Sequence, residues 1–276
     1  MFCRTNFLRS VEVCARRNFS RDSPGSLVGR VAVVTAGTDG IGLAIAKRLA
    51  INGARVVVSS RKQKNVDRAE KEMKDLGLEV MGIQGHVANK SDRKNLIEKT
   101  LEEWGEINIL VQNAGVNPHP FDILSTPESV LDKVYDVHIK SNFQMIQEIY
   151  PHMAKSKAPG SIILSSTVGA YITHAYAGAY AITKASINAM VRAFMPDLLK
   201  CNIRINCLTL GLVDTAFLQA PASNKEARDK FMSAVAMGRF AQPEECAGLA
   251  AYLASDDSSY VTGENFVISG GLYTRP

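Results

Sequence analysis

Tyr180 and Lys184 are the residues of this 276-residue sequence whose types and spacing first suggest chemistry. Residues 178–200 have the apolar spacing of a helix, on which two residues four apart share a face. An ammonium beside a tyrosine stabilises the phenolate and lowers the pKa of the phenol toward working pH. Such a tyrosine can protonate the alkoxide that forms when a hydride reaches a carbonyl carbon. The pair is therefore a candidate acid–base site.

A glycine-rich turn at residues 35–42, TAGTDGIG, joins the first expected strand to the first expected helix. Glycines at such a junction let the backbone turn sharply and approach a pyrophosphate, which lies on the helix N-terminus. The turn predicts a dinucleotide site, and the alternative is a glycine-rich helix cap without a ligand. The candidate cofactor-binding residues of this turn are Thr35, Gly37, Asp39, Gly40, Ile41 and Gly42.

The second expected strand ends in Ser60, Arg61 and Lys62. An enzyme that uses NAD usually has an acidic residue here, which binds the 2′-hydroxyl of the ribose. Two cations can instead pair with a 2′-phosphate, so these residues favour NADPH and NADP+. The alternative is a solvated first turn of a helix, although cations there oppose the helix dipole.

Strand-like and helix-like segments alternate along residues 30–276. The strands are continuous Val/Ile/Leu runs, so both faces of the sheet should be buried, as in a parallel sheet. The sequence predicts one α/β domain of the doubly wound Rossmann type, with a seven-stranded parallel sheet and a ligand at the carboxyl ends of the strands. The expected strands are 30–36, 54–60, 79–85, 107–113, 161–166, 203–209 and 264–269, and the expected helices are 41–52, 62–76, 90–104, 127–153 (one helix or two) and 178–200.

The positive charge of the chain is concentrated at its start. Of the net charge of +5, residues 1–30 carry +4, from six arginines and two acids, so the rest of the chain carries only +1. This near balance argues against nucleic acid as a partner. The arginine-rich, acid-poor leader has the composition of a mitochondrial transit peptide, and RNFS at residues 17–20 resembles a cleavage pattern with the cut after Phe19.

Residues 1–29 are therefore expected to be a transit peptide and linker that direct the protein to the mitochondrial matrix. If the leader is not used, the cytoplasm or the nucleus is the alternative, and the leader is then a frayed basic tail. No apolar run approaches 18 residues, so no membrane span is expected. The five cysteines form no Cys-x-x-Cys pair and no Cys/His cluster, so no metal site is expected.

Several motifs in order resemble the short-chain dehydrogenase/reductase family. They are the turn at 35–42, QNAGV at 112–116, YAITK at 180–184, IRINCLTLG at 203–211, GRFAQPEECAG at 238–248 and YVTGENFVISGG at 260–271. The stretch SSRKQKNVDRA at 59–69 is especially similar to the family branch of dehydrogenase/reductase members two and four, carbonyl reductases that prefer NADPH. The resemblance implies an NADPH-dependent reductase of ketones, aldehydes or vicinal dicarbonyls, which assembles as a dimer or tetramer.

The resemblance also implies residue roles. Tyr180 is the acid/base, and Lys184 binds ribose hydroxyls and tunes Tyr180. Thr167, thirteen residues before Tyr180, stands where the family has the serine that positions the substrate, and Ser166 is the fallback. Thr167 keeps the hydroxyl but is stiffer at χ1, so lower activity is expected. Further cofactor-binding residues are His86, Val87, Asn113, Ala114, Gly115, Gly211, Val213 and Thr215.

Other departures concern Ala36 and His138. Ala36 stands where the family has glycine and is tolerable only if its φ is negative. His138 replaces the asparagine that anchors a water in the family's proton relay. A histidine titrates near neutrality, so it can relay a proton or hold a water, and the alternative is a packing residue that breaks the relay.

Two functions remain open at the level of sequence. The first is the carbonyl reductase, with a substrate pocket closed by residues 211–240, whose Phe217, Phe231, Met232 and Met237 suggest an apolar substrate. The second is an NADP(H)-binding regulatory or interaction protein with little turnover. This second function is considered because the sequence departs from the family pattern at Ala36, His86, His138, Thr167 and Leu210.

Overall fold

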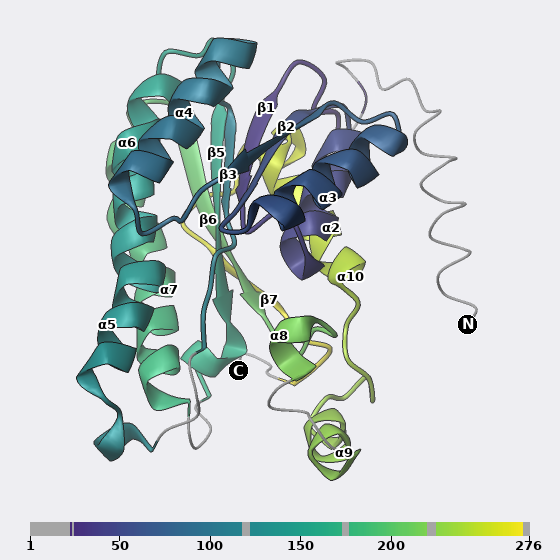
Figure 1. Cartoon of the computed structure of the whole chain (residues 1–276), viewed down its shortest axis with the longest axis vertical. Helices are drawn as coiled ribbons and strands as arrows, with labels where there is room; N and C mark the ends of the chain where they lie inside the picture. The colour runs from purple at the N-terminus through teal and green to yellow at the C-terminus, as the bar shows by residue number, and fades with distance from the viewer. Residues whose placement is uncertain (1–22, 24, 118–121, 173–176, 220–224, 273–276) are drawn as a thin grey trace.

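The computed structural model describes residue 23 and residues 25–117, 122–172, 177–219 and 225–272 (Figure 1). Of the expected transit peptide and linker over residues 1–29, residues 1–22 and 24 therefore lie outside the described residues. Seven parallel strands form one sheet in the order β3-β2-β1-β4-β5-β6-β7. The strands are β1 (Val31–Thr35), β2 (Arg55–Ser60), β3 (Val80–Gln84), β4 (Ile109–Gln112), β5 (Gly160–Thr167), β6 (Ile203–Leu210) and β7 (Asn265–Ile268).

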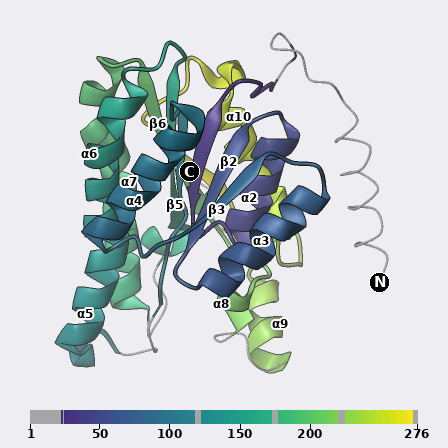
Figure 2. The same ribbon diagram turned by 45° about the horizontal axis from the view of Figure 1, so that its top comes forward.

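Helices cover both faces of the sheet, as Figures 1 and 2 show. On one face lie α2 (Gly40–Ile51), α3 (Gln63–Asp75) and α10 (Pro243–Ala254). On the other lie α4 (Lys90–Trp104), α5 (Glu128–Tyr135), α6 (Ser141–Met153) and α7 (Gly178–Leu199). Short elements complete the fold: η1 (Ile123–Ser125), η3 (Val168–Ala170), α8 (Ala216–Gln219), α9 (Lys225–Ser233) and η4 (Asp256–Ser258).

The central strands are buried on both faces because side chains alternate between the two helical layers. In β1, Val34 packs in the core beneath α2 and α10, and its neighbour Val33 packs in the core beneath α4, α6 and α7. This double burial explains why the strands are continuous apolar runs in the sequence. The doubly wound fold and the seven-stranded parallel sheet are confirmed.

The chain reverses its direction of winding beside β1. It passes outward from β1 to β2 and β3 and then returns to place β4 on the other side of β1. In open α/β sheets such a switch point leaves a crevice at the carboxyl ends of the two strands, where ligands bind. The turn after β1 and the segment after β4 both lie at this edge.

Two helical features differ from the sequence expectation. The segment 127–153 contains α5 and α6 joined by a π-helical segment, Asp136–Lys140, so it is neither one regular α-helix nor two separate ones. Helix α10 was not expected. Its start carries a capping box between Gln242 and Glu245 with Pro243 in the first turn, which is a standard N-terminal signal.

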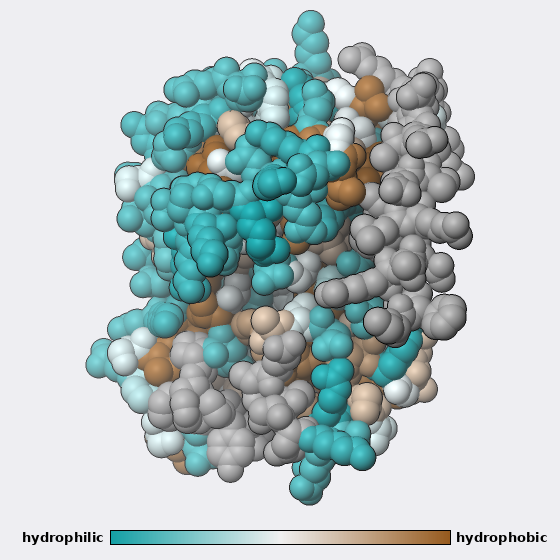
Figure 3. Space-filling view, turned by 45° about the vertical axis from the view of Figure 1, so that its right-hand side comes forward, coloured by the Kyte–Doolittle hydropathy of each residue, from teal (hydrophilic) through white to brown (hydrophobic). Residues whose placement is uncertain are grey.

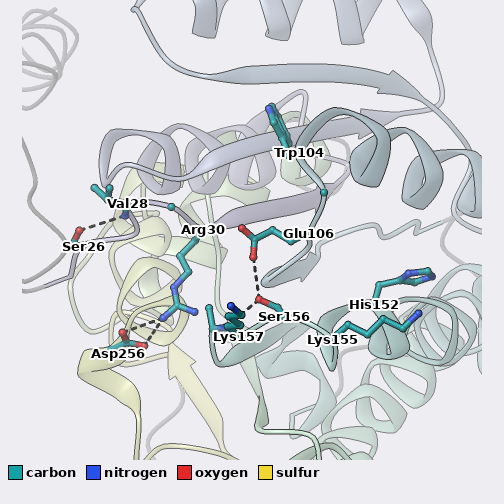
Figure 4. A pocket seen from close by; sticks show the side chains of 13 residues that line it. Ser26, Val28, Arg30, Trp104, Glu106, His152, Lys155, Ser156, Lys157 and Asp256 are labelled. Carbon is teal, nitrogen blue, oxygen red and sulfur yellow. Dashed lines mark hydrogen bonds and ion pairs between the residues drawn. The ribbon is translucent and has the colours of Figure 1, made fainter.

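The side of the molecule shown in Figure 3 is largely hydrophilic, and α3 contributes charged side chains to the surface. A cavity of about 580 Å³ lies at the amino-terminal end of the sheet (Figure 4). Its lining includes Arg30, Glu106 and Ser156, which precede β1, β4 and β5. Arg30 is already paired with Asp256 at 2.9 Å, and Ser156 donates to Glu106 at 3.0 Å. This cavity is at the opposite end of the strands from the switch point.

Arg93 of α4 is a buried cation that joins three parts of the helical layer. Its guanidinium donates to both carboxylate oxygens of Glu148 at 2.9 Å, to Gln144 Oε1 at 2.7 Å and to the Val87 carbonyl at 2.9 Å. The Arg93 side chain is 1% exposed. Arg93 therefore fixes the loop after β3 to α4 and α6.

Replacing Arg93 by methionine is expected to lower the free energy of unfolding by about 3 kcal/mol, because the partly buried Glu148 carboxylate loses the cation that pairs with it. Chemical denaturation measures the change. Lys94→Met is the matched control: Lys94 pairs with Glu98 on the surface, where a salt bridge contributes at most about 1 kcal/mol. Equal losses in the two variants would contradict a structural role for Arg93.

Candidate active site

The turn between β1 and α2 is strained and tightly packed. Ala36 has a φ of +48°, so the expectation of a negative φ is wrong. The left-handed conformation costs a non-glycine residue about 1–2 kcal/mol, and neighbouring contacts must hold it. The Gly37 N–H donates to the Ser59 carbonyl at 3.1 Å, and Asn113 Nδ2 donates to the Ala36 carbonyl at 3.4 Å. No side chain fits at Gly42, where a Cβ would collide with the Ala36 carbonyl and Asn113.

The same turn presents unpaired N–H groups at the N-terminus of α2. Asp39 caps the helix by accepting from the Gly40 N–H at 2.9 Å. Within the described part of the chain, the N–H groups of Thr38, Asp39, Ile41 and Gly42 have no acceptor. Clustered donors at a helix N-terminus are suited to a phosphate, so the turn fits the pyrophosphate of a dinucleotide.

The two cations expected to select the cofactor are exposed beside this turn. Arg61 and Lys62 follow Ser60 at the end of β2, and both side chains are free to meet solvent or ligand. His86, in the loop after β3, lies within electrostatic range of Arg61. Burial lowers the pKa of His86, Arg61 and Lys133 lower it further, and Asp92 opposes them. The next residue, Val87, contributes its carbonyl to Arg93.

The segment after β4 connects the turn to the catalytic candidates. The Asn113 N–H donates to Thr35 Oγ1 at 3.1 Å, which ties this segment to the end of β1. Ala114 follows, and Gly115 then lies against Lys184 and His138. A Cβ at Gly115 would stand 3.4 Å from Lys184 Nζ and 3.6 Å from His138 Nε2. A glycine here therefore leaves room for both groups.

The segment after β6 reaches the same region from the other side. A Cβ at Gly40 would stand 3.1 Å from Thr215 Cγ2, so Thr215 faces the phosphate turn. Val213 is held by a bridge to Ala241, and Gly211 approaches Ser269 so closely that a Cβ would meet its Cα at 2.7 Å. Of these three residues, Thr215 is therefore the one that these contacts bring to the phosphate turn, whereas Gly211 and Val213 contact Ser269 and Ala241.

Tyr180 and Lys184 lie one turn apart on α7, as their spacing predicts. Lys184 Nζ donates to the Ser165 carbonyl at 2.9 Å and stands 5.8 Å from the centre of the Tyr180 ring. Only 4% of Lys184 is exposed, and burial lowers its pKa to about 8. Burial raises the pKa of Tyr180. Burial is the cause of this rise, and the expected lowering of the tyrosine pKa, which involves a bound nicotinamide as well as the ammonium, stays a prediction.

The two hydroxyl candidates for substrate positioning have different surroundings. Ser166 is buried, and its Oγ donates to the Lys184 carbonyl at 2.9 Å, so it supports α7. Thr167, at the end of β5, is half-buried and its Oγ1 accepts the Gly169 N–H at 3.2 Å. That bond uses one lone pair and leaves the hydroxyl proton of Thr167 available to a carbonyl oxygen.

His138 is fully buried within the π-helical segment, and both of its ring nitrogens are bonded. The Val116 N–H donates to Nε2 at 3.0 Å, so the ring proton lies on Nδ1 and points at Thr183 Oγ1, 2.8 Å away. Thr183 in turn donates to the Tyr180 carbonyl at 2.9 Å. The His138 and Tyr180 rings also pack in a T-shaped arrangement, with centroids 5.5 Å apart.

This bonding keeps His138 neutral. Burial first, and then the charge of Lys184, lower the pKa of His138 to about 2. Its carbonyl is occupied as well, accepting from Asn142 Nδ2 at 2.6 Å. His138 therefore links the segment after β4 to α7 through the hydrogen bonds of its ring. Sequence reasoning missed Thr183 and the Ser165 carbonyl, because neither contact has a local sequence signal.

An apolar side chain borders the catalytic candidates. The Phe217 ring of α8 lies 6.1 Å from the Tyr180 ring and is 49% exposed. Met237, also expected near the substrate, is 63% exposed. In the described residues, no group of His, Cys, Asp and Glu side chains could hold a metal ion. None of the described helices is long and apolar enough to cross a membrane.

A phosphate-binding turn at the switch point, followed by a tyrosine and a lysine on one helix, defines a nicotinamide-dependent oxidoreductase. A family model described as enoyl-(acyl carrier protein) reductase matches residues 35–273. Dehydrogenase/reductase SDR family member 4 of Caenorhabditis elegans is 45% identical, over 90% of this chain and 96% of its own length. The human protein of that name is 39% identical, over 90% and 89%. The chain belongs to the short-chain dehydrogenase/reductase family and is an oxidoreductase.

Two further relatives agree with this assignment. Tropinone reductase-like 3 of Erythroxylum coca is 40% identical over 90% of this chain and 94% of its own length. A crystal structure from Agrobacterium tumefaciens, provisionally assigned as a gluconate dehydrogenase, superposes with a TM-score of 0.85 at 25% identity. It covers 90% of this chain and 97% of that chain. The family and the fold imply a nicotinamide cofactor, NAD or NADP.

The buried, neutral state of His138 gives a pH prediction. The pKa of an unfolded histidine is about 6.5, whereas that of folded His138 is about 2, so only the unfolded chain takes up this proton between those values. This contribution to stability is complete above pH 6.5 and is lost on acidification, by about 1.4 kcal/mol per pH unit below pH 6.

Urea denaturation of the wild type and of His138→Asn at pH 7.5, 5.5 and 4.5 isolates this contribution, because asparagine does not titrate. The stability difference between the two proteins should shrink as the pH falls. A difference that is constant with pH would show that His138 takes up its proton equally in the folded and the unfolded protein, and would contradict the lowered pKa.

Proposed function

We propose that this protein is an NADPH-dependent carbonyl reductase acting on ketones, aldehydes or vicinal dicarbonyls. The observation that carries the proposal is the position of Tyr180 and Lys184 on α7, beside the segment after β4 and next to Phe217. The proposal draws further support from relatives named as reductases. A small carbonyl compound with an apolar substituent fits the exposed Phe217 ring.

NADPH supplies the hydride when it is bound. Thr167 donates a hydrogen bond from its hydroxyl to the carbonyl oxygen of the substrate, keeps its proton, and so polarises the C=O bond. Tyr180 gives its phenolic proton to the same oxygen as the negative charge develops there. Lys184, which carries its charge below a pKa of about 8, stabilises the resulting phenolate and offers its remaining N–H groups to the ribose hydroxyls.

The cofactor choice rests on the charge at the end of β2. Arg61 and Lys62 are exposed cations at the position where an enzyme that uses NAD usually has an acid. An arginine can bind a 2′-phosphate through two parallel N–H groups, whereas a 2′-hydroxyl gains nothing from the charge. We therefore propose NADPH rather than NADH as the preferred cofactor.

Three further assignments belong to the same proposal. Residues 1–29 are a transit peptide and linker, cut after Phe19, and residues 30–276 form the catalytic domain in the mitochondrial matrix. The protein is a homodimer or homotetramer. The helical layer of α5, α6 and α7 supports an oligomer, because it exposes the large apolar side chains Leu131, Tyr135, Phe143, Tyr150 and Ile182.

An alternative function is a cofactor-binding protein with little turnover. One observation favours it: both ring nitrogens of His138 are engaged, so the ring offers no free group to a water or a proton at this position. Measuring NADPH binding and dicarbonyl-dependent NADPH oxidation in parallel separates the two functions. Tight binding without oxidation would support the alternative.

Tyr180→Phe is expected to lower kcat at least about a hundredfold, because general acid catalysis contributes factors of that order. The NADPH dissociation constant should stay within about threefold, because the phenol lies away from the pyrophosphate turn. Stopped-flow absorbance with a dicarbonyl panel gives the rate, and calorimetry gives the affinity. Tyr171→Phe, an exposed tyrosine outside the helix, is the matched control. Turnover that survives Tyr180→Phe would reject the mechanism.

The double variant Arg61→Ala, Lys62→Ala is expected to raise the NADPH dissociation constant by about a hundredfold, since each charge-assisted contact contributes about 1.5 kcal/mol or more. The NADH constant should change less than threefold. Lys64→Ala, which removes an exposed cation from the first turn of α3, serves as the control. Equal effects on the two cofactors would contradict the assignment of NADP(H).

A further inference from the structure

Arg68 makes a contact that neither the fold nor the Tyr180–Lys184 pair requires. It lies in the middle of α3, and its Nη2 donates to the Thr38 carbonyl at 2.6 Å. Thr38 is 3% exposed and stands between Ala36 and Gly40, the two residues of the turn with positive φ. A half-exposed arginine from a neighbouring helix thus reaches into the strained part of the phosphate turn.

The direction of the Thr38 carbonyl determines the direction of the next N–H group. In a planar trans peptide the C=O and the following N–H point in opposite directions. Because the Thr38 carbonyl points at α3, the Asp39 N–H points away from α3. Thr215 lies against Gly40, the next residue of the turn. The Asp39 N–H has no acceptor among the described residues, so it is left available to a ligand.

A second contact holds Arg68 in place. Its Nη1 lies 3.6 Å from Glu72 Oε2, and the other carboxylate oxygen of Glu72 accepts from Lys47 Nζ at 2.5 Å. Lys47 belongs to α2, the helix that the turn begins. Lys47, Glu72, Arg68 and the Thr38 carbonyl therefore connect α2, α3 and the turn. These contacts hold the Thr38 carbonyl in a fixed position relative to the N-terminus of α2.

The other carbonyl groups of the turn show the same arrangement. The Ala36 carbonyl accepts from Asn113 on one side, and the Thr38 carbonyl accepts from Arg68 on the other. These two carbonyls are turned toward protein donors, and the N–H groups of Thr38, Asp39, Ile41 and Gly42 stay available among the described residues.

We propose that Arg68 is a positioning residue for the pyrophosphate of the cofactor, acting through the Thr38–Asp39 peptide, and that it does not bind the 2′-phosphate. The inference rests on the proposed function, since it requires a dinucleotide in the turn. It assigns different parts of the cofactor to two sets of cations: Arg61 and Lys62 recognise the 2′-phosphate, and Arg68 prepares the site for the part that NADPH and NADH share.

The test compares Arg68→Met and Arg68→Lys with Lys71→Met in the full chain. Lys71 is one turn nearer the end of α3 than Arg68 and pairs with Asp75 on the surface, so its loss removes the same charge from the same helix. Isothermal titration calorimetry gives the dissociation constants of NADPH and NADH, and thermal unfolding checks the fold. Arg68→Met should raise both constants about tenfold, which corresponds to about 1.4 kcal/mol.

The ratio of the two constants should remain within about twofold of the wild-type ratio. Arg68→Lys should give an intermediate rise, because one donor remains, and Lys71→Met should change neither constant. A rise for NADPH alone would overturn the inference and make Arg68 a ligand of the 2′-phosphate. Unchanged constants in Arg68→Met, with a wild type that binds both cofactors, would overturn it as well. A wild type that binds neither cofactor would instead refute the proposed function and this inference with it.

Discussion

The close approach of the Ala36 carbonyl to Gly42 and Asn113 is the constraint on which the site depends. It brings the end of β1, the start of α2 and the segment after β4 into one packed unit, in which no side chain fits at Gly42. The end of β2 joins this unit through the Ser59 carbonyl, and α3 joins it through Arg68. The left-handed backbone of Ala36 is held by these surroundings, so the strain is stored where the backbone must face a ligand.

Burial sets the electrostatics of the catalytic candidates. It is the first cause of the shifts in the pKa of Tyr180, Lys184 and His138, and in each case it favours the neutral form. No carboxylate contributes to these shifts among the described residues. Burial, without a compensating carboxylate, therefore sets the charge state of these three groups before any ligand arrives. An anionic dinucleotide supplies negative charge, and the affinity for the cofactor and the ionisation of Lys184 are coupled for this reason.

The sequence was sufficient for the sheet, because a strand buried on both faces must be a continuous apolar run. It was also sufficient to place Tyr180 and Lys184 on one face of a helix, and to place the glycine-rich turn between the first strand and the first helix. It failed where the outcome depends on distant contacts. The φ of Ala36 depends on Asn113, the tautomer of His138 depends on Val116 and Thr183, and the bond from Arg68 crosses 30 residues of sequence. Helix α10 was also missed, but for another reason: its capping signal at Gln242 and Glu245 is local and is present in the sequence.

The two hydrogen bonds of the His138 ring also affect which sequence changes the protein can accept. The ring satisfies the Val116 N–H and Thr183 Oγ1 at once, and an asparagine side chain is too short to span the same two groups. A return to the asparagine of other family members therefore gives up at least one of these two contacts, while the Thr183 hydroxyl keeps its bond to the Tyr180 carbonyl. The substitution at position 138 and the residue at 183 are tied by epistasis. Such a dependence makes the change hard to reverse by single steps, so lineages that share this histidine are expected to share a small hydroxyl-bearing residue three positions after the tyrosine.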